Sequence, residues 1–524
     1  MRGDHGDGSV VGSDGRVKPF AGGLAVARSN RRQFLGRAVA ATAGFGAGFA
    51  IGGTKSSGRI IGANAAIRVG VAGLNGRGAS HVEELARLPG VEITYLIDPD
   101  SRTFPKRLGQ LRKLVPGARP KMVADVAEAL DDKELDALTI ATPNHWHALM
   151  TVWGCQAGKD VYVEKPCSHD VHEGRMAVEA ARKYGRVVQH GTQTRSSRKW
   201  AEVAEAVKSG GYGKLLVSRG LCYKPRWEKP QGNIGVRPDG PTPTGLDFNL
   251  WTGPAPLHPY NANYVPYNWH WFWDYGNGDI GNQGVHQMDI ARWMIPGATL
   301  PRSVVSLGGR FGYQDQGQTP NTQVAVFEYG ETLLIFEVRG LKAEPYLGQK
   351  VGNILHLEAG TIADGLFTPK GSSKAEPLAR RDASGPAAEG NHFANFIDAV
   401  RSRKPGDLKA EILEGHYSSA LGHLANISYR LGSPTSFGST PKPLGEDGPG
   451  ADAFLRMKDH LATENGLDPS ELAFQLGPKL RFDADSEVFV DAPEADKLLS
   501  RDGRSPFVAP RPSGRSSVPE TSPS

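Results

Sequence analysis

The chain has 524 residues, of which 39% are hydrophobic, so it is long enough for two or three soluble domains with cores of their own. Its formal net charge of +5 is concentrated in residues 1–65, which hold nine Lys or Arg and three Asp or Glu and leave the rest of the chain nearly neutral. This balance argues against a surface that binds nucleic acid or anionic membranes.

Residues 1–65 resemble an export leader that the twin-arginine machinery reads. Residues 29–36 (SNRRQFLG) contain the Arg31-Arg32 pair, an uncharged Gly/Ala-rich stretch follows at 38–54, and Ala63-Asn64-Ala65 is a small-x-small cleavage candidate. The apolar stretch is shorter than the ~20 residues that a spanning helix needs, so a leader is favoured over a permanent membrane anchor. We therefore expect an exported protein, periplasmic or otherwise extracytoplasmic.

From Ile67 onward, short β-rich runs alternate with helical runs, which is typical of a parallel βαβ sheet. Helices are expected up to about Leu88 and at about 146–157 and 172–184. Six strands with intervening helices predict a doubly wound Rossmann sheet over residues 66–191. The predicted strands are 67–72, 91–97, 121–123, 136–141, 161–163 and 187–190.

Beyond residue 192 the pattern changes to a helix, a strand and a long Pro/Gly/Trp-rich stretch that ends near Gly278. Successive strand-like runs without helices then favour an antiparallel sheet, followed by helices at 392–403 and 410–431. The predicted fold class is α/β, a doubly wound Rossmann domain plus a C-terminal α+β domain with an open, mainly antiparallel sheet at 192–432. Residues 433–524 are expected to form an extension with a disordered tail from about Arg504. The predicted strands of the second domain are 215–221, 303–311, 323–329, 332–339 and 354–359.

The turn between the first strand and the first helix is a candidate pyrophosphate site, because backbone N–H groups and a helix N-terminus bind phosphate there. Asn75 departs from the G-x-G-x-x-G pattern, but asparagine tolerates left-handed backbone conformations, so we expect the turn to form. Asp98 ends the second strand, where a carboxylate accepts the ribose hydroxyls and disfavours a 2′-phosphate. NAD is therefore favoured, while Arg102 leaves NADP open. The candidate cofactor residues of this region are Gly73, Asn75, Gly76, Arg77, Gly78 and Asp98.

Two further loops, residues 142–147 and 164–166, follow strands at the edge where a doubly wound sheet binds its ligand. Lys165 is the leading catalytic candidate, because an ammonium group beside a nicotinamide can hydrogen-bond the oxygen whose charge changes during hydride transfer. Burial beside a cationic ring would lower its pKa. The alternative is a solvated loop lysine.

Ala141-Thr142-Pro143-Asn144 with His147, and Val163-Glu164-Lys165-Pro166, resemble the Gfo/Idh/MocA family of glucose-fructose oxidoreductases and inositol dehydrogenases. The similarity spans about residues 67–432, and residues 276–289 resemble the motif of the family's second domain. The resemblance implies an NAD(P)-dependent oxidoreductase that transfers hydride at a secondary hydroxyl of a sugar, polyol or related compound. It also implies a homo-oligomer. Since an exported enzyme meets no free nicotinamide pool, we expect the cofactor to be tightly bound.

In that second motif a carboxylate and a His or Tyr lie four residues apart, and the resemblance implies that His286 is the acid/base. An imidazole that titrates near neutrality suits this role. Asn282 stands where many relatives have Asp, so the usual dyad is altered, and Asp279 or Asp289 could supply the missing carboxylate. Without the resemblance, His286 reads as a packed helix histidine.

The resemblance also implies cofactor contacts around the nicotinamide ribose and substrate contacts from residues 193–195. The H-x-H pair of His145 and His147 has no acidic or cysteine partner, and the odd cysteines Cys155, Cys167 and Cys222 form no C-x-x-C pair, so no metal site or disulfide framework is expected. The implied cofactor residues are Thr142, Pro143, Asn144, His147, Glu164 and Lys165; the implied substrate residues are Gln193 and Arg195.

Trp269, Trp271 and Trp273 alternate around His270, and alternation in an extended segment would turn the three indoles to one side. Sugar faces stack on such rings, so Trp269, His270 and Asp279 join His286 as candidate substrate residues, although an aromatic stripe can equally be core. Two other functions stay open. One is an NAD-dependent glycosidase that acts by transient oxidation and elimination, and the other is a non-catalytic binding or scaffold protein.

Overall fold

The computed structural model describes residues 66–226, 232–378 and 390–508. The predicted leader at 1–65 and the last part of the Ser/Pro-rich tail lie outside these residues. Within the described ranges, no helix has the length and apolar character needed to cross a membrane.

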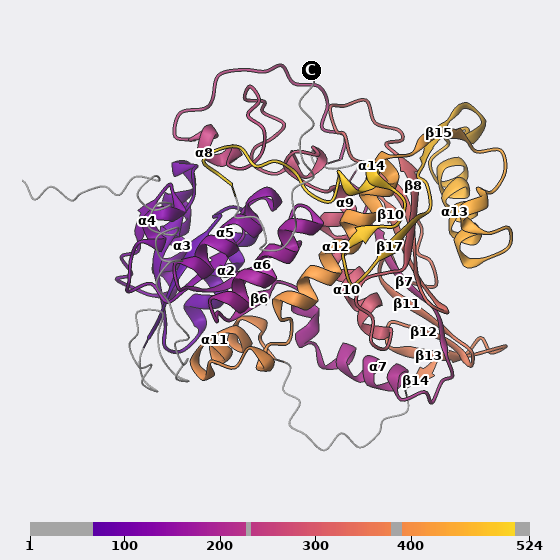
Figure 1. Cartoon of the computed structure of the whole chain (residues 1–524), viewed down its shortest axis with the longest axis horizontal. Coiled ribbons are helices and arrows are strands. Elements are labelled where there is room, and N and C mark those ends of the chain that lie inside the picture. Colours follow the sequence, from indigo (N-terminus) through magenta and orange to yellow (C-terminus); the bar gives the residue numbers. More distant parts are fainter. Residues whose placement is uncertain (1–65, 227–231, 379–389, 509–524) are drawn as a thin grey trace, which may run out of the picture.

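The first domain is a six-stranded parallel sheet with the strand order β3-β2-β1-β4-β5-β6, which confirms the predicted doubly wound topology (Figure 1). Helices cover both faces, so the strands are buried throughout the centre of the sheet. The strands are β1 (Ile67–Ala72), β2 (Val91–Ile97), β3 (Lys121–Val123), β4 (Ala137–Ile140), β5 (Asp160–Val163) and β6 (Val188–His190). The helices are α2 (Gly76–Arg87), α3 (Phe104–Leu114), α4 (Val126–Leu130), α5 (Asn144–Gln156) and α6 (Val171–Lys183).

The second domain is built on a mixed, mainly antiparallel sheet, as predicted, in which β7 and β10 form a parallel pair. Its order is β14-β13-β12-β11-β7-β10-β9-β8-β16-β15, with β17 pairing with β8 and β18. The strands are β7 (Leu215–Tyr223), β8 (Ser303–Gly309), β9 (Thr322–Tyr329), β10 (Thr332–Arg339), β11 (Val351–Leu357), β12 (Gly360–Ala363), β13 (Leu366–Pro369), β14 (Glu376–Pro377), β15 (Ser433–Ser436), β16 (Ala473–Leu476), β17 (Leu480–Asp483) and β18 (Val488–Phe489). The helices are α7 (Arg198–Lys208), α8 (Phe248–Thr252), α9 (Gly278–Asn282), α10 (Gly284–Met294), α11 (His392–Ser402), α12 (Ile412–Arg430), α13 (Pro449–Asp459) and α14 (Pro493–Asp496).

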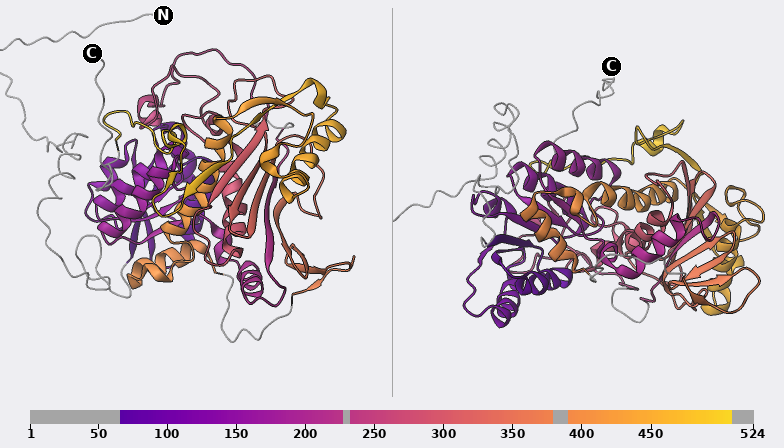
Figure 2. Two further views of the ribbon diagram at one scale, coloured as in Figure 1. Left: turned by 45° about the vertical axis from the view of Figure 1, so that its right-hand side comes forward. Right: turned by 90° about the horizontal axis from the view of Figure 1, so that it is seen from below.

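Helices α10 and α12 pack on the face of the second sheet that looks toward the first domain, and α13 packs on the opposite, outer face (Figures 1 and 2). Helix α11 returns to the first domain, where Phe396 and Val400 share a core with Val69 and Val71 of β1. The chain that we assigned to the second domain therefore also completes the first.

The described part of the C-terminal extension belongs to the second sheet. Strands β16 and β17 pair with β8, and β15 pairs with β16. On the outer face, Phe454 and Met457 of α13 bury the apolar side chains of Val324 and Ile335. The tail that we expected to be disordered from Arg504 is folded at least to Phe507, whose ring is buried in the core of the first domain.

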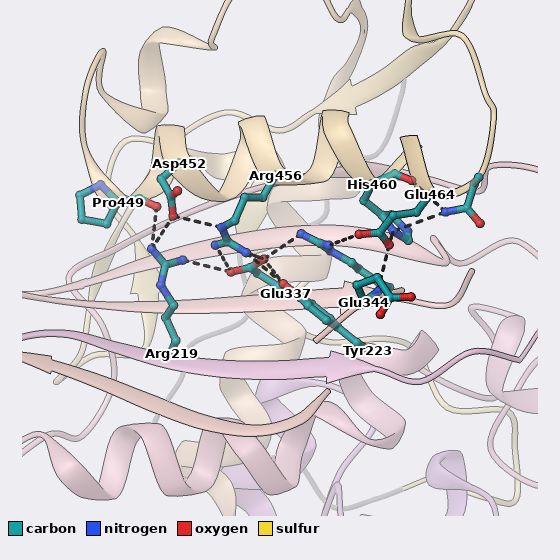
Figure 3. A network of polar contacts seen from close by, with 11 residues as sticks. Arg219, Tyr223, Glu337, Glu344, Pro449, Asp452, Arg456, His460 and Glu464 are labelled. Carbon is teal, nitrogen blue, oxygen red and sulfur yellow. Dashed lines mark hydrogen bonds and ion pairs between the residues drawn. The ribbon is translucent and has the colours of Figure 1, made fainter. Parts of the chain in front are cut away.

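A buried ionic network joins α13 to β7 and β10 (Figure 3). Glu337, only 1% exposed, accepts hydrogen bonds from Arg456 (2.6 and 2.8 Å), Arg219 (3.0 Å) and the Tyr223 hydroxyl (2.6 Å). Burial by itself would raise the pKa of Glu337, but the charges of Arg456, Arg219 and Arg339 outweigh it and lower the pKa to about 2. The ionised Glu337 carboxylate thus holds α13 against the sheet through Arg456.

Replacing Glu337 by Gln keeps the shape of the side chain but leaves Arg219 and Arg456 with the half-exposed Asp452 as their remaining carboxylate partner. We expect a loss of ~3 kcal/mol in the free energy of unfolding, measured by urea titration. The matched control is Glu331→Gln, because Glu331 forms only an exposed pair with Lys214 and should cost less than ~0.5 kcal/mol. Equal midpoints for the two variants would contradict the structural role of the network.

Candidate active site

A cavity of about 350 Å³ lies at the carboxyl ends of the first domain's strands and is closed by the second domain. All three predicted catalytic residues, Lys165, Asn282 and His286, line it. Three other predicted site residues, Gly78, Arg195 and Asp279, do not line the cavity. The other predicted site residues that line the cavity are Gly73, Asn75, Gly76, Arg77, Asp98, Thr142, Pro143, Asn144, His147, Glu164, Gln193, Trp269 and His270.

The glycine turn is held by two close backbone approaches. A Cβ on Gly73, whose φ is +81°, would lie 2.5 Å from the Ala141 carbonyl oxygen, and a Cβ on Gly78 would lie 1.8 Å from the Gly73 oxygen. Asn75 is extended (φ −79°, ψ −173°), so the turn forms without the left-handed conformation that asparagine tolerates. Helix α2 begins directly after it, and the unpaired N–H groups of its first turn lie at the cavity, where an anion is favoured.

Asp98 fastens this turn to the end of β2. Its carboxylate accepts from the backbone N–H groups of Leu74 (2.8 Å) and Asp100 (2.9 Å), and burial raises the pKa of Asp98 to about 6. Arg102, which left NADP open, pairs with Asp100 at 2.7 Å through two nitrogens. Its charge is thus balanced by a carboxylate, which fits NAD better than NADP.

Glu164 is a buried carboxylate at the inner end of the cavity. It accepts from Arg77 (2.7 Å), His81 (3.1 Å) and Gln193 (2.9 Å). Burial raises the pKa of Glu164, but the hydrogen bond with His81 and the charges of Arg77 and Lys165 outweigh that effect and hold the pKa well below its usual range. Glu164 therefore stays ionised and orders the side chains that surround it.

In the loop at residues 142–147, the polar side chains of His147 and Asn144 form hydrogen bonds to other parts of the protein. Both ring nitrogens of His147 lie on backbone carbonyls, those of Pro166 (2.5 Å) and Thr142 (2.7 Å), so the ring joins the two cavity loops. The Asn144 amide donates to Asn277 of the second domain (3.1 Å). The Thr142 hydroxyl, by contrast, is buried and has no hydrogen-bond partner within the described chain, which leaves it available to a ligand.

Lys165 crosses from β5 to the second domain. Its ammonium donates to the backbone oxygen (2.5 Å) and the side-chain oxygen (3.3 Å) of Asn282, whose amide donates in turn to the Tyr267 hydroxyl (3.2 Å). Burial, together with the charges of nearby arginines and Lys224, lowers the pKa of Lys165 to about 8. The solvated-lysine alternative does not describe this environment.

His286 lies in the same cavity, and its side chain has no hydrogen-bond partner in the part of the chain that the structure describes. Burial and the neighbouring Lys165 lower the pKa of His286 to about 3, so our expectation of titration near neutrality is wrong. Neither proposed carboxylate orients it, because Asp279 pairs with Arg226 (2.6 Å) and Asp289 pairs with Arg195 (2.8 Å). The imidazole is therefore neutral and free to accept or donate to a ligand.

The tryptophan segment is not extended, which corrects the predicted alternation. Residues Asn268–Trp271 form a 3-10 helix, in which Trp269 stacks on His270 with ring centroids 3.6 Å apart. The His270 Nδ1 lies 2.6 Å from the Tyr267 carbonyl and must carry the proton, which leaves Nε2 as an acceptor. Trp271 instead packs under Arg226.

Residues 243–277, which we call the roof, close the cavity over the first domain. The roof is joined to the end of β2 by backbone hydrogen bonds from Ser101 to Gly245 (2.8 Å) and from Asp247 to Pro99 (2.9 Å). Sequence reasoning missed this role because the Pro/Gly-rich composition shows no periodicity. The roof residues that line the cavity are Leu250, Trp251, Val265, Pro266, Tyr267, Trp269 and His270.

Two regions of the chain, one in each domain, match family models. Residues 67–192 match the model described as oxidoreductase family, NAD-binding Rossmann fold, and residues 203–315 match the C-terminal alpha/beta domain of the same family. Both regions are therefore similar to the Gfo/Idh/MocA oxidoreductase family.

Two kinds of enzyme are found among the curated proteins that this chain is similar to. An inositol 2-dehydrogenase from Leifsonia xyli is 32% identical over 161 residues, which is 30% of this chain and 45% of that enzyme. An alpha-N-acetylgalactosaminidase from Shewanella oneidensis is 28% identical over 224 residues, 39% of this chain and 48% of that enzyme. The chain thus matches less than half the length of either relative.

Among solved structures, the WlbA dehydrogenase from Chromobacterium violaceum in complex with NADH and UDP-GlcNAcA is similar at a TM-score of 0.50. The two sequences are 17% identical, and the match covers 70% of this chain and 95% of that one. This similarity supports the fold of the two domains.

Gly78→Ala should disrupt the glycine turn, because the added Cβ would collide with a backbone oxygen. We expect the Kd for NADH, measured by fluorescence titration, to rise at least ~10-fold, which corresponds to ~1.4 kcal/mol. Gly109→Ala in α3 is the matched control, since nothing lies within 4 Å of its added Cβ. The interpretation of the turn would be contradicted by equal NADH affinity in the two variants.

Proposed function

We propose that the protein is an NAD-dependent oxidoreductase that transfers hydride at a secondary hydroxyl of a sugar, polyol or related compound. The observation that carries the proposal is the meeting of Lys165, Asn282 and His286 from two domains in one cavity that continues into the glycine turn. NAD is preferred to NADP because Asp98 lines the ribose end and Arg102 is neutralised by Asp100.

The residues present fit this cofactor. The first turn of α2 and Gly76 would hold the pyrophosphate, Asp98 the ribose hydroxyls, and the unpartnered Thr142 hydroxyl offers a further polar contact. When bound, NAD supplies the hydride chemistry, and the protein supplies position, a proton acceptor and charge stabilisation. The roof covers the same cavity, which supports a cofactor that is retained between turnovers.

Lys165 is the group best matched to proton transfer. With a pKa of about 8 it exchanges a proton near physiological pH, whereas His286 with a pKa of about 3 stays neutral. In oxidation, neutral Lys165 accepts the proton as the substrate O–H bond breaks, and His286 orients the hydroxyl by hydrogen bonding. In reduction, the Lys165 ammonium returns that proton to the oxygen.

The relative with alpha-N-acetylgalactosaminidase activity favours a second candidate, a glycosidase that oxidises a sugar hydroxyl transiently, eliminates the glycosidic bond and reduces the product. This reaction uses the same cavity and the same proton acceptor. It differs in having no net change in the redox state of the cofactor.

The test uses the purified full-length chain. Denaturation should release NAD into the supernatant, and incubation of the holoprotein with sugars and polyols such as myo-inositol should produce net NADH absorbance. Release of an aryl aglycone without net NADH would favour the glycosidase. A preparation that neither contains nor binds nicotinamide nucleotide would contradict both candidates and leave the scaffold alternative.

We further propose that residues 1–65 direct export by the twin-arginine machinery, as the Arg31-Arg32 pair and the cleavage candidate suggest. The homo-oligomer implied by family resemblance stays a prediction. Since α13 covers the outer face of β8, β9 and β10, a second subunit would have to use another surface.

The pH dependence of kcat/KM should follow the protonation state of Lys165. Because the neutral fraction of Lys165 rises about tenfold per pH unit below its pKa, kcat/KM for oxidation should rise with pH and level off above about 8. Lys165→Met should lower kcat/KM at least ~100-fold. Lys159→Met is the control, since burial also lowers the pKa of Lys159 to about 8 but its ammonium binds backbone oxygens outside the cavity.

Asn282→Asp tests the role of Lys165 in proton transfer by changing the group that its ammonium contacts. A carboxylate beside the ammonium favours its charged form, so the midpoint of the oxidation profile should move up by ~1 pH unit. A midpoint that stays in place, or an unchanged profile in Lys165→Met, would remove Lys165 from the proton transfer.

A further inference from the structure

We propose that residues 499–507, which we call the strap, latch the roof over the cofactor cleft and set the rate at which nicotinamide dinucleotide leaves. The proposal rests on the proposed function for the identity of the ligand. Arg501 and Arg504 are its positioning residues, since they act through the roof and not on substrate.

The strap joins the cores of both domains. It leaves α14 beside the second sheet and crosses to α8 above the first domain, as the yellow segment of Figure 1 shows. At one end Leu499 is buried in the core of the second domain and its carbonyl accepts from the His172 N–H of α6 (3.0 Å). At the other end Phe507 is buried in the core of the first domain.

Arg501 gathers three separate elements. Its guanidinium donates to the carbonyls of His145 in α5 (3.1 Å) and Asp274 in the roof (2.9 Å), and to the Glu173 carboxylate of α6 (3.0 Å). The His145 ring itself contacts the roof carbonyls of Trp251 (3.0 Å) and Tyr275 (3.3 Å). Arg501 therefore fixes the first turn of α5, which borders the cavity, against the end of the roof.

Arg504 holds the other part of the roof. Its guanidinium donates to the Gly253 carbonyl (3.1 Å) and to the backbone and side-chain oxygens of Asn249 (2.9 and 2.8 Å). The backbone N–H of Arg504 donates to the Pro254 carbonyl (3.1 Å). These acceptors lie in and just after α8. Charge-assisted hydrogen bonds to several carbonyls restrain this short helix more strongly than neutral ones would.

Phe507 links the strap to the wall of the cavity. Its ring packs edge-on against Trp146, with centroids 5.3 Å apart, and the Trp146 indole donates to the roof carbonyl of Trp251 (2.9 Å). Gly253 is so close to that indole that a Cβ there would lie 2.3 Å from it. Strap, indole and roof therefore interlock around side chains that line the cofactor cavity.

The contacts between the strap and the roof bear on how fast the cofactor can leave the cavity. Leu250 and Trp251 of the roof line the same cavity as the glycine turn, so movement of the roof away from the first domain would widen the path by which a dinucleotide leaves the cavity. The strap is bonded to the roof on one side and to α5 and α6 on the other. Its contacts must break for that movement.

The experiment uses the full-length chain, Arg501→Ala, Arg504→Ala and the double variant, each loaded with NADH and mixed with excess NAD in a stopped-flow fluorimeter. We expect NADH dissociation to be at least tenfold faster in the double variant. Arg481→Ala is the matched control, since Arg481 lies in the same C-terminal segment but forms only an exposed pair with Asp491. Its dissociation rate should equal that of the unchanged protein.

A second readout does not depend on the nucleotide. Hydrogen exchange of residues 248–254 in the nucleotide-free protein should be faster in the double variant than in Arg481→Ala. Dissociation rates within twofold of the control, together with unchanged exchange in the roof, would overturn the latch. If the double variant fails to fold, Arg504→Ala alone and Phe507→Leu carry the same comparison. If the unchanged protein binds no NADH, the proposed function fails, while the exchange measurement still decides whether the strap restrains the roof.

Discussion

The hydrogen bond from the Lys165 ammonium to Asn282 is the contact on which the site depends. It joins the end of β5 in the first domain to the helices of the second and places the ammonium beside His286. Because the ammonium is buried and the positive charges of Arg77, Lys224 and Arg226 lie nearby, its affinity for the proton is reduced. The same ammonium group thus joins the two domains and, through its burial, has a lowered pKa.

The charges around the cavity are arranged in pairs that leave few groups free. Glu164 is matched by Arg77, Asp279 by Arg226 and Asp289 by Arg195. Such buried pairs orient the elements that carry them, since a single unmatched charge in the interior is costly. His286 and the Thr142 hydroxyl, which lack protein partners in the described chain, then stand out as the polar groups available to a ligand.

Two C-terminal segments complete structures that begin far earlier in the chain. Helix α13 covers the outer face of the second sheet and is fixed there by Glu337, while the strap connects the second core to the roof and to the first core. Residues 433–508 therefore serve the second sheet and the cavity alike. A chain ending at Leu431 would expose an apolar sheet face and leave the roof without its outer contacts.

Local patterns in the sequence were enough to predict the doubly wound domain, the mainly antiparallel second sheet and the set of loops at the cavity, because strand periodicity and glycine turns are local properties of the backbone. The place of Lys165 after a strand of the first sheet made it a candidate, and the family resemblance added His286. The neutral state of His286, the pairing of Asp279 and Asp289 with arginines, and the 3-10 helix at residues 268–271 became visible only in the folded chain. Burial and charge pairing depend on residues far apart in the chain, such as Arg501 and His145, and no local pattern encodes which of them will meet.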